Sequence, residues 1–317
     1  MMKKTLTVFT PTYNRAHTLV RTYESLCAQT CKDFVWLIID DGSTDETKKE
    51  VSSWIEKQQL FVPDESSESI EESFCGLCRN DIYIAYILKK NGGLHTGYNV
   101  AIANMNTELC TCIDSDDWMP EDGVEKIINF WKDNGSGDVA GILGLDFIDG
   151  NPIGGYFPEG VVKLKMIEMS RKYHHYGDVK VVHRTELLKQ VAPMPTFDGE
   201  KNFNPIYLFY KIDENYPLLL LNENLCCVEY QQDGMSNNIF HQYVNSPRSF
   251  AELRKLFMSR IDAPWTSCFR NAIHYVSSEI MLSNRNWLKE SPKRIITLLA
   301  SPFGLLLFVY IKLKTRK

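Results

Sequence analysis

The sequence predicts an α/β fold: a mostly parallel sheet flanked by helices and followed by a helical tail. Three observations support this. Apolar, strand-like segments alternate with helix-like segments through the first half of the 317 residues, a pattern typical of parallel sheets. Polar loops follow the apolar segments, where ligands gather in such sheets. The composition, 44% hydrophobic and 12% aromatic, is sufficient for a large core.

The predicted elements can be placed in order along the chain. Strands are expected at residues 5–9, 35–39, 82–88 and 109–113, and helices at 19–27, 46–57 and 98–105. Residues 63–73 are rich in Ser, Asp and Glu and lack hydrophobic periodicity. They are expected to form a solvated insertion loop.

Composition and missing motifs exclude several classes of protein. The formal charge is −5 and no long basic run precedes the last thirty residues, so no nucleic-acid partner is expected. The P-loop string is missing, and Gly92, Gly93 and Gly97 do not follow dinucleotide spacing. Nine cysteines without a repeating frame indicate reduced thiols. The first residues lack the apolar core of a signal peptide, so a cytoplasmic protein is expected.

Two polar clusters follow the first two predicted strands. In the first, residues 10–15, Pro11 stiffens the turn and Tyr13 offers a flat face for a base, although a loop tyrosine also serves in packing. In the second, residues 40–45, Gly42 allows an unusual backbone and the carboxylates can accept hydrogens from a base or ribose. The alternative is a turn with a helix cap at Thr44 or Asp45.

The third cluster places three carboxylates within four residues. Asp114, Asp116 and Asp117 follow the apolar segment 109–113. Such a group needs a counter-charge, and Mg²⁺ or Mn²⁺ supplies one because hard cations prefer oxygen ligands and commonly bind substrate phosphates as well. A solvated acidic turn is the alternative. The position after an apolar strand favours the metal site.

Four strings resemble the family 2 glycosyltransferases of the bacterial cell-surface polysaccharide type. They are TPTYNR at 10–15, IIDDGSTDET at 38–47, NGGLHTGYN at 91–99 and DSDDWMPEDG at 114–123, and the likeness extends over roughly residues 3–235. This resemblance implies the Rossmann-like GT-A fold and inverting transfer of a sugar from a nucleotide-diphosphate donor. A UDP-sugar is the preferred donor, with Mn²⁺ or Mg²⁺ as cofactor.

The resemblance also implies roles for individual residues. The nucleotide is expected at Pro11, Thr12, Tyr13, Arg15, Asp41, Asp114 and Ser115; the donor sugar and diphosphate at Asn91, Gly92, His95, Asn99, Asp233 and Ser236; and the metal at Asp116 and Asp114. Leu94 stands where a basic residue is common in the family, so His95 is a candidate for that work. A structural histidine is the alternative.

An inverting enzyme also needs a carboxylate that takes a proton from the acceptor hydroxyl. The segment 197–203 resembles the family's acidic loop, which makes Glu200 the first candidate and Asp198 the second. Relatives often carry a further acid where this chain has Pro205 and Ile206, which is a departure from the pattern. A surface ion pair with Lys201 or a charge at a helix start is the alternative for Glu200.

The C-terminal residues 295–313 are nearly all apolar and end in a basic tail. About 20 apolar residues are enough to cross a bilayer. Pro302 and Gly304 are expected to interrupt the segment, however, and basic residues flank it, so a helix that lies on or dips into the cytoplasmic leaflet is favoured. A core helix packed on the body or on a partner is the alternative.

These observations give a complete prediction for the chain. We expect a nucleotide-sugar-binding half at 1–118, an acceptor-binding and catalytic half at 119–240, a helical extension at 241–292 and a membrane-associating segment at 293–317. The predicted enzyme transfers a sugar to a glycan or polyprenyl-linked acceptor at the inner face of the cell membrane. A catalytically inactive binding or scaffolding subunit with the same fold is the alternative.

Overall fold

The structure is a computed structural model that describes residues 4–64, 69–229 and 238–316. It divides into two compact units, which we call the sheet unit and the helical unit. The sheet unit consists of Met1–Asn91, Gly97–Pro193 and Leu208–Tyr230, and the helical unit of Gly92–Thr96, Met194–Tyr207 and Gln231–Lys317. This division reflects how the residues pack and not what they do. The functional ranges predicted from the sequence therefore stay a prediction.

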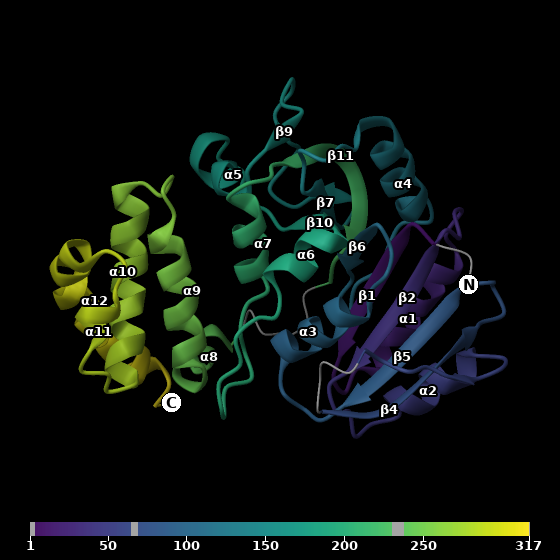
Figure 1. Cartoon of the computed structure of the whole chain (residues 1–317), viewed down its shortest axis with the longest axis horizontal. Helices are drawn as coiled ribbons and strands as arrows, with labels where there is room; N and C mark the ends of the chain where they lie inside the picture. Colours follow the sequence, from purple (N-terminus) through teal and green to yellow (C-terminus); the bar gives the residue numbers. More distant parts are fainter. Residues whose placement is uncertain (1–3, 65–68, 230–237, 317) are drawn as a thin grey trace. The chain divides into compact units, whose positions relative to one another are not determined.

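The sheet unit is built on a mixed sheet, with eleven strands among the described residues, in the order β3-β4-β5-β2-β1-β6-β10-β7-β11-β9 and β8 beside β7. The strands are β1 (Leu6–Thr12), β2 (Phe34–Asp40), β3 (Gln59–Leu60), β4 (Ile70–Leu77), β5 (Tyr83–Lys89), β6 (Leu109–Cys112), β7 (Gly141–Ile148), β8 (Asn151–Pro152), β9 (Lys163–Leu164), β10 (Val179–Arg184) and β11 (Leu218–Cys227). The central strands β5, β2, β1 and β6 are mutually parallel. The predicted fold class is confirmed (Figure 1).

Helices flank the sheet between its strands (Figure 1). They are α1 (Ala16–Cys27), α2 (Thr47–Trp54), α3 (Leu94–Asn104), α4 (Gly123–Asn134), α5 (Met166–Lys172), α6 (Thr185–Val191) and α7 (Ile206–Asp213). The aromatic side chains of Tyr23, Trp36 and Trp54 stack between α1, β2 and α2, with ring centroids of Tyr23 and Trp54 4.2 Å apart. Burial of such rings supplies a large share of the core energy.

Two predicted boundaries need correction. The expected loop 63–73 is wrong at its end, because residues 70–73 begin strand β4, which pairs with β5. The exposed Glu71 and Glu72 concealed this strand, whose buried side chains Phe74 and Cys75 come only later. The helix expected at 98–105 begins earlier, at Leu94, directly after the glycine pair.

The helical unit contains α8 (Ile239–Asn245), α9 (Pro247–Ser259), α10 (Trp265–Met281), α11 (Trp287–Glu290) and α12 (Arg294–Lys314) (Figure 1). Its core includes Met258 of α9, Tyr275 and Val276 of α10, and Ala300 of α12. One face of α12 thus packs within the unit. The alternative of a core helix therefore holds for that face of the C-terminal segment.

The expected interruption at Pro302 and Gly304 is wrong, since α12 runs without a break through both residues. Proline cannot donate to the carbonyl four residues earlier, and here the Ser301 hydroxyl donates to that carbonyl of Leu298 at 2.8 Å. Gly304 lets α12 approach α10 closely, because a Cβ there would lie 2.6 Å from Cβ of Val276. Both residues serve helix packing.

Candidate active site at the carboxyl edge of the sheet

Four parallel strands bring their polar loops to one edge of the sheet unit. Strands β1, β2, β5 and β6 end at Thr12, Asp40, Lys89 and Cys112, and their parallel pairing places these ends on the same side. Ligands of open α/β sheets bind outside these carboxyl ends. The polar clusters predicted from the sequence follow three of the four strands.

The loops after β1 and β2 are joined by hydrogen bonds. The Asn14 amide donates to the Ser43 hydroxyl, and the Thr44 amide donates to the Asn14 side-chain oxygen, both at 2.8 Å. Asn14 has a φ of 53°, a conformation that asparagine tolerates better than most residues. Tyr13, the residue between the end of β1 and Asn14, is 49% exposed. Its ring is therefore open to a ligand.

Both carboxylates at the end of β2 have protein partners. Asp40 accepts hydrogen bonds from the Tyr86 hydroxyl at 2.6 Å and from the Ser43 amide at 2.7 Å. Asp41 forms a buried ion pair with Lys89. These contacts explain two adjacent acids without a ligand, which the sequence alone did not. The role of Asp41 in nucleotide binding stays a prediction.

The acidic loop after β6 combines exposed and buried carboxylates. Asp114 is exposed, Asp116 is half-buried, and Ser115 and Asp117 are buried. Burial, reinforced by the charge of Asp114, raises the pKa of Asp116. Burial also raises the pKa of Asp117 to about 7. Nearby positive charge is needed to keep such a group ionised.

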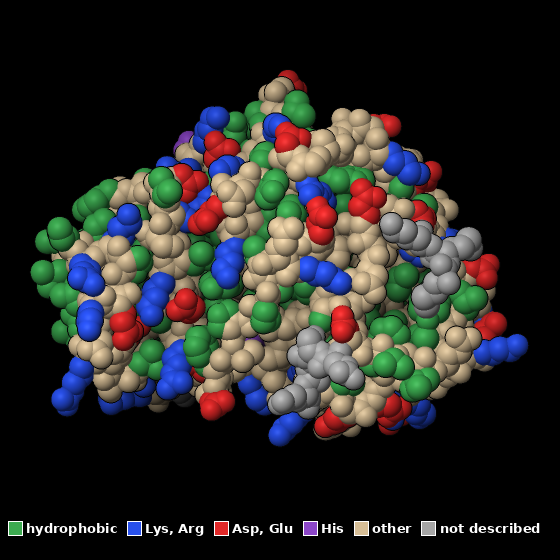
Figure 2. Space-filling model, viewed as in Figure 1, with side chains coloured by type: hydrophobic (Ala, Val, Ile, Leu, Met, Phe, Trp, Pro, Cys, Tyr) green, Lys and Arg blue, Asp and Glu red, His purple; other side chains and the backbone are tan. Residues whose placement is uncertain are grey.

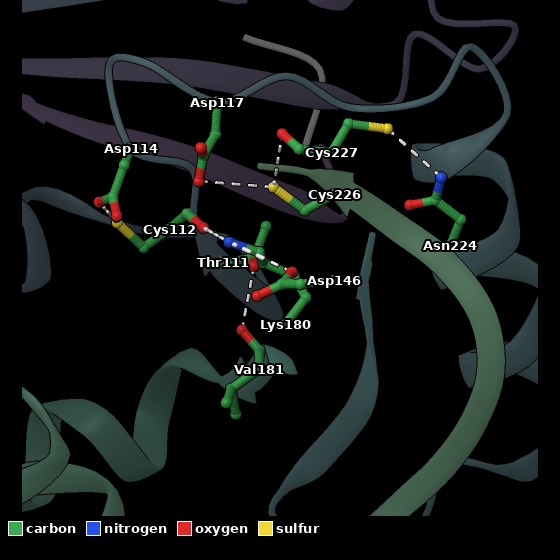
Figure 3. Close-up of polar contacts among 10 residues, drawn as sticks. All are labelled: Thr111, Cys112, Asp114, Asp117, Asp146, Lys180, Val181, Asn224, Cys226 and Cys227. Carbon is green, nitrogen blue, oxygen red and sulfur yellow. Dashed lines mark hydrogen bonds and ion pairs between the residues drawn. The ribbon is translucent and has the colours of Figure 1, made fainter. Parts of the chain in front are cut away.

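One source of positive charge is Lys180 of β10, which the sequence analysis missed. Its ammonium lies 3.8 Å from a carboxylate oxygen of Asp146 on β7 and donates to the Cys112 carbonyl at 3.3 Å (Figure 3). Burial alone would lower the pKa of Lys180, but nearby acids, Asp146 foremost, hold it well above its ordinary value. Burial raises the pKa of Asp146 to about 6. Lys180 is thus a fixed cation beneath the acidic loop.

A second cation, Arg21 of α1, holds the acidic loop from another side. Its guanidinium donates to the backbone carbonyl of Asp116 and pairs with Glu229. It also lies 4.2 Å from the ring centroid of Trp118, a favourable cation–π position. Sequence reasoning missed Arg21, because nothing in the helix pattern of residues 16–27 distinguishes it from a surface charge.

The donor set of the acidic loop fits a hard divalent cation. Asp114 and Asp116 present carboxylate oxygens, which Mg²⁺ and Mn²⁺ prefer. Burial is the main cause of the raised pKa of Asp116, and the charge of Asp114 adds a repulsion that a cation would relieve. In the described part of the chain, no three His, Cys, Asp or Glu side chains converge as a metal cage. Two carboxylates with water and substrate phosphates are the arrangement Mg²⁺ commonly takes.

The predicted donor residues after β5 are divided between the two units. Asn91 belongs to the sheet unit, where its side-chain amide donates to the Asp41 carbonyl at 2.7 Å. Asn99 is half-buried in α3. Gly92 and His95 belong to the helical unit. His95 is fully buried, and its ring centroid lies 6.2 Å from that of Phe203.

The two candidate bases have different surroundings within the helical unit. Glu200 is buried, and its carboxylate accepts hydrogen bonds from the Arg248 amide at 2.9 Å, the Ser249 amide at 2.8 Å and the Ser249 hydroxyl at 2.7 Å. These amides open helix α9, where free N–H groups favour an anion. Asp198 is exposed. The base assignment stays a prediction, and Asp233 and Ser236 lie outside the described residues.

The fold and the acidic loop define an α/β protein with a binding edge suited to a nucleotide and a divalent cation. The family described as Glycosyl transferase family 2 matches residues 7–179, more than half of the chain. The chain belongs to this family.

Relatives match part of the chain. Glycosyltransferase GlyA of Streptococcus pneumoniae is 30% identical over 132 residues, which cover 40% of this chain and 16% of the relative. An uncharacterised glycosyltransferase of Rickettsia felis is 31% identical over 129 residues, covering 41% and 17%. The chain thus aligns with about one sixth of the length of these relatives.

Solved structures share the fold over nearly the whole chain. TarS 1-349 of S. aureus in complex with UDP-GlcNAc superposes with a TM-score of 0.58 at 15% identity, covering 98% of this chain and 91% of that one. The mannosyltransferase PcManGT of Pyrobaculum calidifontis, in complex with GDP-Man and Mn²⁺, gives a TM-score of 0.55 at 15% identity, covering 100% and 84%. At this identity the likeness concerns the fold.

Proposed function

We propose that this chain is an inverting glycosyltransferase that moves a sugar from a nucleotide-diphosphate donor, a UDP-sugar by preference, to a hydroxyl of a glycan or polyprenyl-linked acceptor. The observation that carries the proposal is the acidic loop Asp114–Asp117 at the carboxyl edge of a family 2 sheet. A charged diphosphate needs a cation and ordered loops at such an edge. This edge offers carboxylates that could hold the cation, and loops that are joined by hydrogen bonds.

Different residues of this edge contact different parts of the donor. The exposed ring of Tyr13 stacks on the base, while Asp41 accepts hydrogens from it. Asp114 and Asp116 would hold Mn²⁺ or Mg²⁺, which, when bound, supplies charge that stabilises the leaving diphosphate. Arg21 keeps the backbone at Asp116 in place.

The acceptor hydroxyl must lose a proton as the new bond forms. Glu200 is the first candidate for this base and Asp198 the second. The carboxylate of Glu200 is already engaged by hydrogen bonds at the start of α9. This favours an equal test of the exposed Asp198.

A second candidate function is that of a catalytically inactive glycosyltransferase-like binding or scaffolding subunit. Two observations favour it: Pro205 and Ile206 stand where relatives often carry an acid, and Glu200 is engaged by α9. Such a protein would bind a nucleotide sugar without turning it over. The intact acidic loop favours the enzyme.

We further propose that the protein works at the cytoplasmic face of the cell membrane in cell-surface polysaccharide synthesis. One relative, TarP of Staphylococcus aureus, is named a poly(ribitol-phosphate) beta-N-acetylglucosaminyltransferase and is 27% identical over 147 residues, covering 46% of this chain and 38% of the relative. Helix α12 supports this proposal. It is an apolar helix of 21 residues, and only 22% of its most apolar stretch is buried.

A donor screen tests the proposal. Hydrolysis of UDP-, GDP- and other nucleotide sugars is measured with and without Mn²⁺, using wild type and Asp116→Asn. We expect Mn²⁺-dependent hydrolysis of one donor class in wild type and loss of about a hundredfold or more in the variant, with an unchanged melting temperature. Donor binding without turnover would favour the inactive subunit. Unchanged turnover in Asp116→Asn would overturn the metal assignment.

A further inference from the structure

The outward face of α12 is apolar along the whole helix. Nine of its apolar side chains are exposed: Ile295, Leu298, Leu299, Phe303, Leu305, Leu306, Val309, Tyr310 and Leu313. At 100° per residue they fall within ~160° of the helix circumference. The charged residues of the helix lie near its two ends. Figure 2 shows hydrophobic side chains gathered over this helix.

Helix α10 extends this face with aromatic side chains. The exposed Trp265 stacks on Phe269 at a centroid distance of 5.2 Å, and Phe269 meets Phe303 edge-on at 5.8 Å. We call Trp265 and the nine residues of α12 the apolar strip. An exposed apolar area of this extent marks an interaction site.

Basic residues flank the apolar strip at both ends of α12. Lys289, Lys293 and Arg294 precede it and are exposed. At the other end, the ammonium groups of Lys312 and Lys314 lie 6.0 and 5.8 Å from the rings of Phe308 and Tyr310. Lysines near apolar side chains keep their stems in the apolar layer and their charges at its border. This pattern is complementary to anionic headgroups above a hydrocarbon layer.

We propose that the helical unit binds an anionic lipid bilayer through the apolar strip, with α12 lying in the plane of the membrane. The inference rests on the proposed function in one respect: membrane binding would give the enzyme access to a lipid-linked acceptor. Its physical basis is the strip, its aromatic extension and its basic borders. A peripheral helix with an apolar face and basic edges binds bilayers in this way.

The packing of α12 indicates whether this helix lies in the plane of the membrane or crosses the membrane. A helix of 21 residues is about 31 Å long and matches the hydrocarbon thickness, so length permits both. A crossing α12 would either leave Tyr275 and Val276 of α10 without cover or carry α10 into the hydrocarbon. Helix α10 contains the buried Glu279 and Asn271, and such groups are costly in a bilayer. Lying in the plane keeps the unit intact.

Vesicle sedimentation tests the surface. Wild type is expected to sediment with vesicles of phosphatidylglycerol and phosphatidylcholine, and less with phosphatidylcholine alone. The double variant Leu299→Glu, Leu306→Glu is expected to bind at least about tenfold more weakly. Leu60→Glu, an exposed leucine of β3, is the matched control and keeps binding. Equal sedimentation of the double variant and wild type, with both folded by circular dichroism, would overturn the proposal.

Two further measurements test the orientation and the occupant. A C-terminal epitope tag on protein added to sealed vesicles should be removed by external protease, whereas a protected tag would show a crossing helix. A dimer that dissociates in the double variant, without vesicle binding by wild type, would assign the strip to a second copy. UDP binding is measured in parallel. A protein that binds vesicles but transfers no sugar overturns only the proposed function.

Discussion

At the scale of single residues, stability and transfer rate measured on the same variants distinguish the two candidate bases. Glu200→Gln weakens the hydrogen bonds to the start of α9 and should cost about 1–2 kcal/mol of stability. If Glu200 is also the base, transfer falls about a hundredfold or more while UDP affinity stays unchanged. Melting temperature, transfer rate and UDP affinity are measured on each variant.

Asp198→Asn is the matched variant in the same loop. Its carboxylate is exposed, so its loss should leave stability within about 0.5 kcal/mol of wild type. Loss of transfer in this variant, with full activity in folded Glu200→Gln, would show that Asp198 is the base and that Glu200 only caps the helix.

A buried histidine gives a prediction for acid stability. Burial lowers the pKa of His183 on β10 to about 3, whereas an unfolded chain has a histidine pKa of about 6.5. Between these values the unfolded state binds a proton that the folded state does not. The contribution of His183 is therefore fully present above pH 6.5 and is lost as pH falls towards 3.

His183→Leu should remove this dependence. From pH 6.5 to pH 4.5, the free energy of unfolding of wild type should fall more than that of the variant, by up to about 1.4 kcal/mol per pH unit. Urea unfolding at both pH values measures the difference, and each protein's own value at pH 7 corrects for lost packing. Parallel curves for the two proteins would contradict the prediction.

The sequence patterns predicted the loop residues of the site better than the buried residues that lie beneath those loops. Asp114, Asp116 and Tyr13 stand in recognisable loops. Asp146 and Lys180, which lie beneath them, do not. Asp146 is the single charge in the apolar strand GILGLDFI, and Lys180 stands between valines in VKVVHR, a strand that ends in Arg184. Since a lone buried charge needs a partner, these two strands held a signal, but the sequence did not show that they are neighbours.

At the scale of elements, Arg21 links helix α1 to the acidic loop after β6. Arg21→Leu removes its pairing with Glu229, its hydrogen bond to Asp116 and its contact with Trp118. The loop then loses its fixed position, and the Kd for UDP in the presence of Mn²⁺ should rise by about tenfold. Without Mn²⁺ the change should be smaller, since the carboxylates matter most when they share a cation.

Isothermal titration with and without Mn²⁺ measures this difference. Lys163→Leu is the matched control, because Lys163 forms a surface ion pair with Asp138 at 2.8 Å away from the acidic loop. The control should keep wild-type affinity. An equal loss with and without Mn²⁺ would show that Arg21 supports the fold generally and not the acidic loop.

Elements with a strong hydrophobic period were predictable, and those with mixed signals were not. The strands at β1, β2, β5 and β6 were predicted near their observed positions because each is mostly apolar and carries no charge before its last residue. Strand β4 was missed because its first residues carry the charges of a loop. The break expected in α12 failed for another reason: Ser301 and Val276 supply the contacts that make Pro302 and Gly304 acceptable.

At the scale of the whole molecule, the packing of α12 changes what a truncation should do. If residues 293–317 served only as a membrane-associating segment, their deletion would release the protein from membranes and leave activity on a soluble acceptor. The structure places Ala300 in the core of the helical unit and buries Ile311 completely. Each large buried aliphatic side chain contributes about 1.5–3 kcal/mol. Deletion therefore removes part of a folded unit as well as a membrane contact.

We therefore expect the truncated protein to bind UDP but to lose transfer on a soluble acceptor. The sheet unit has its own core and contains the acidic loop, so nucleotide binding should persist. The segment Met194–Tyr207, with both candidate bases, belongs to the helical unit and depends on its integrity. Full-length Leu299→Glu, Leu306→Glu, which keeps the packed face of α12, should retain transfer on the same acceptor. Full transfer by the truncated protein would show that α12 contributes only membrane binding.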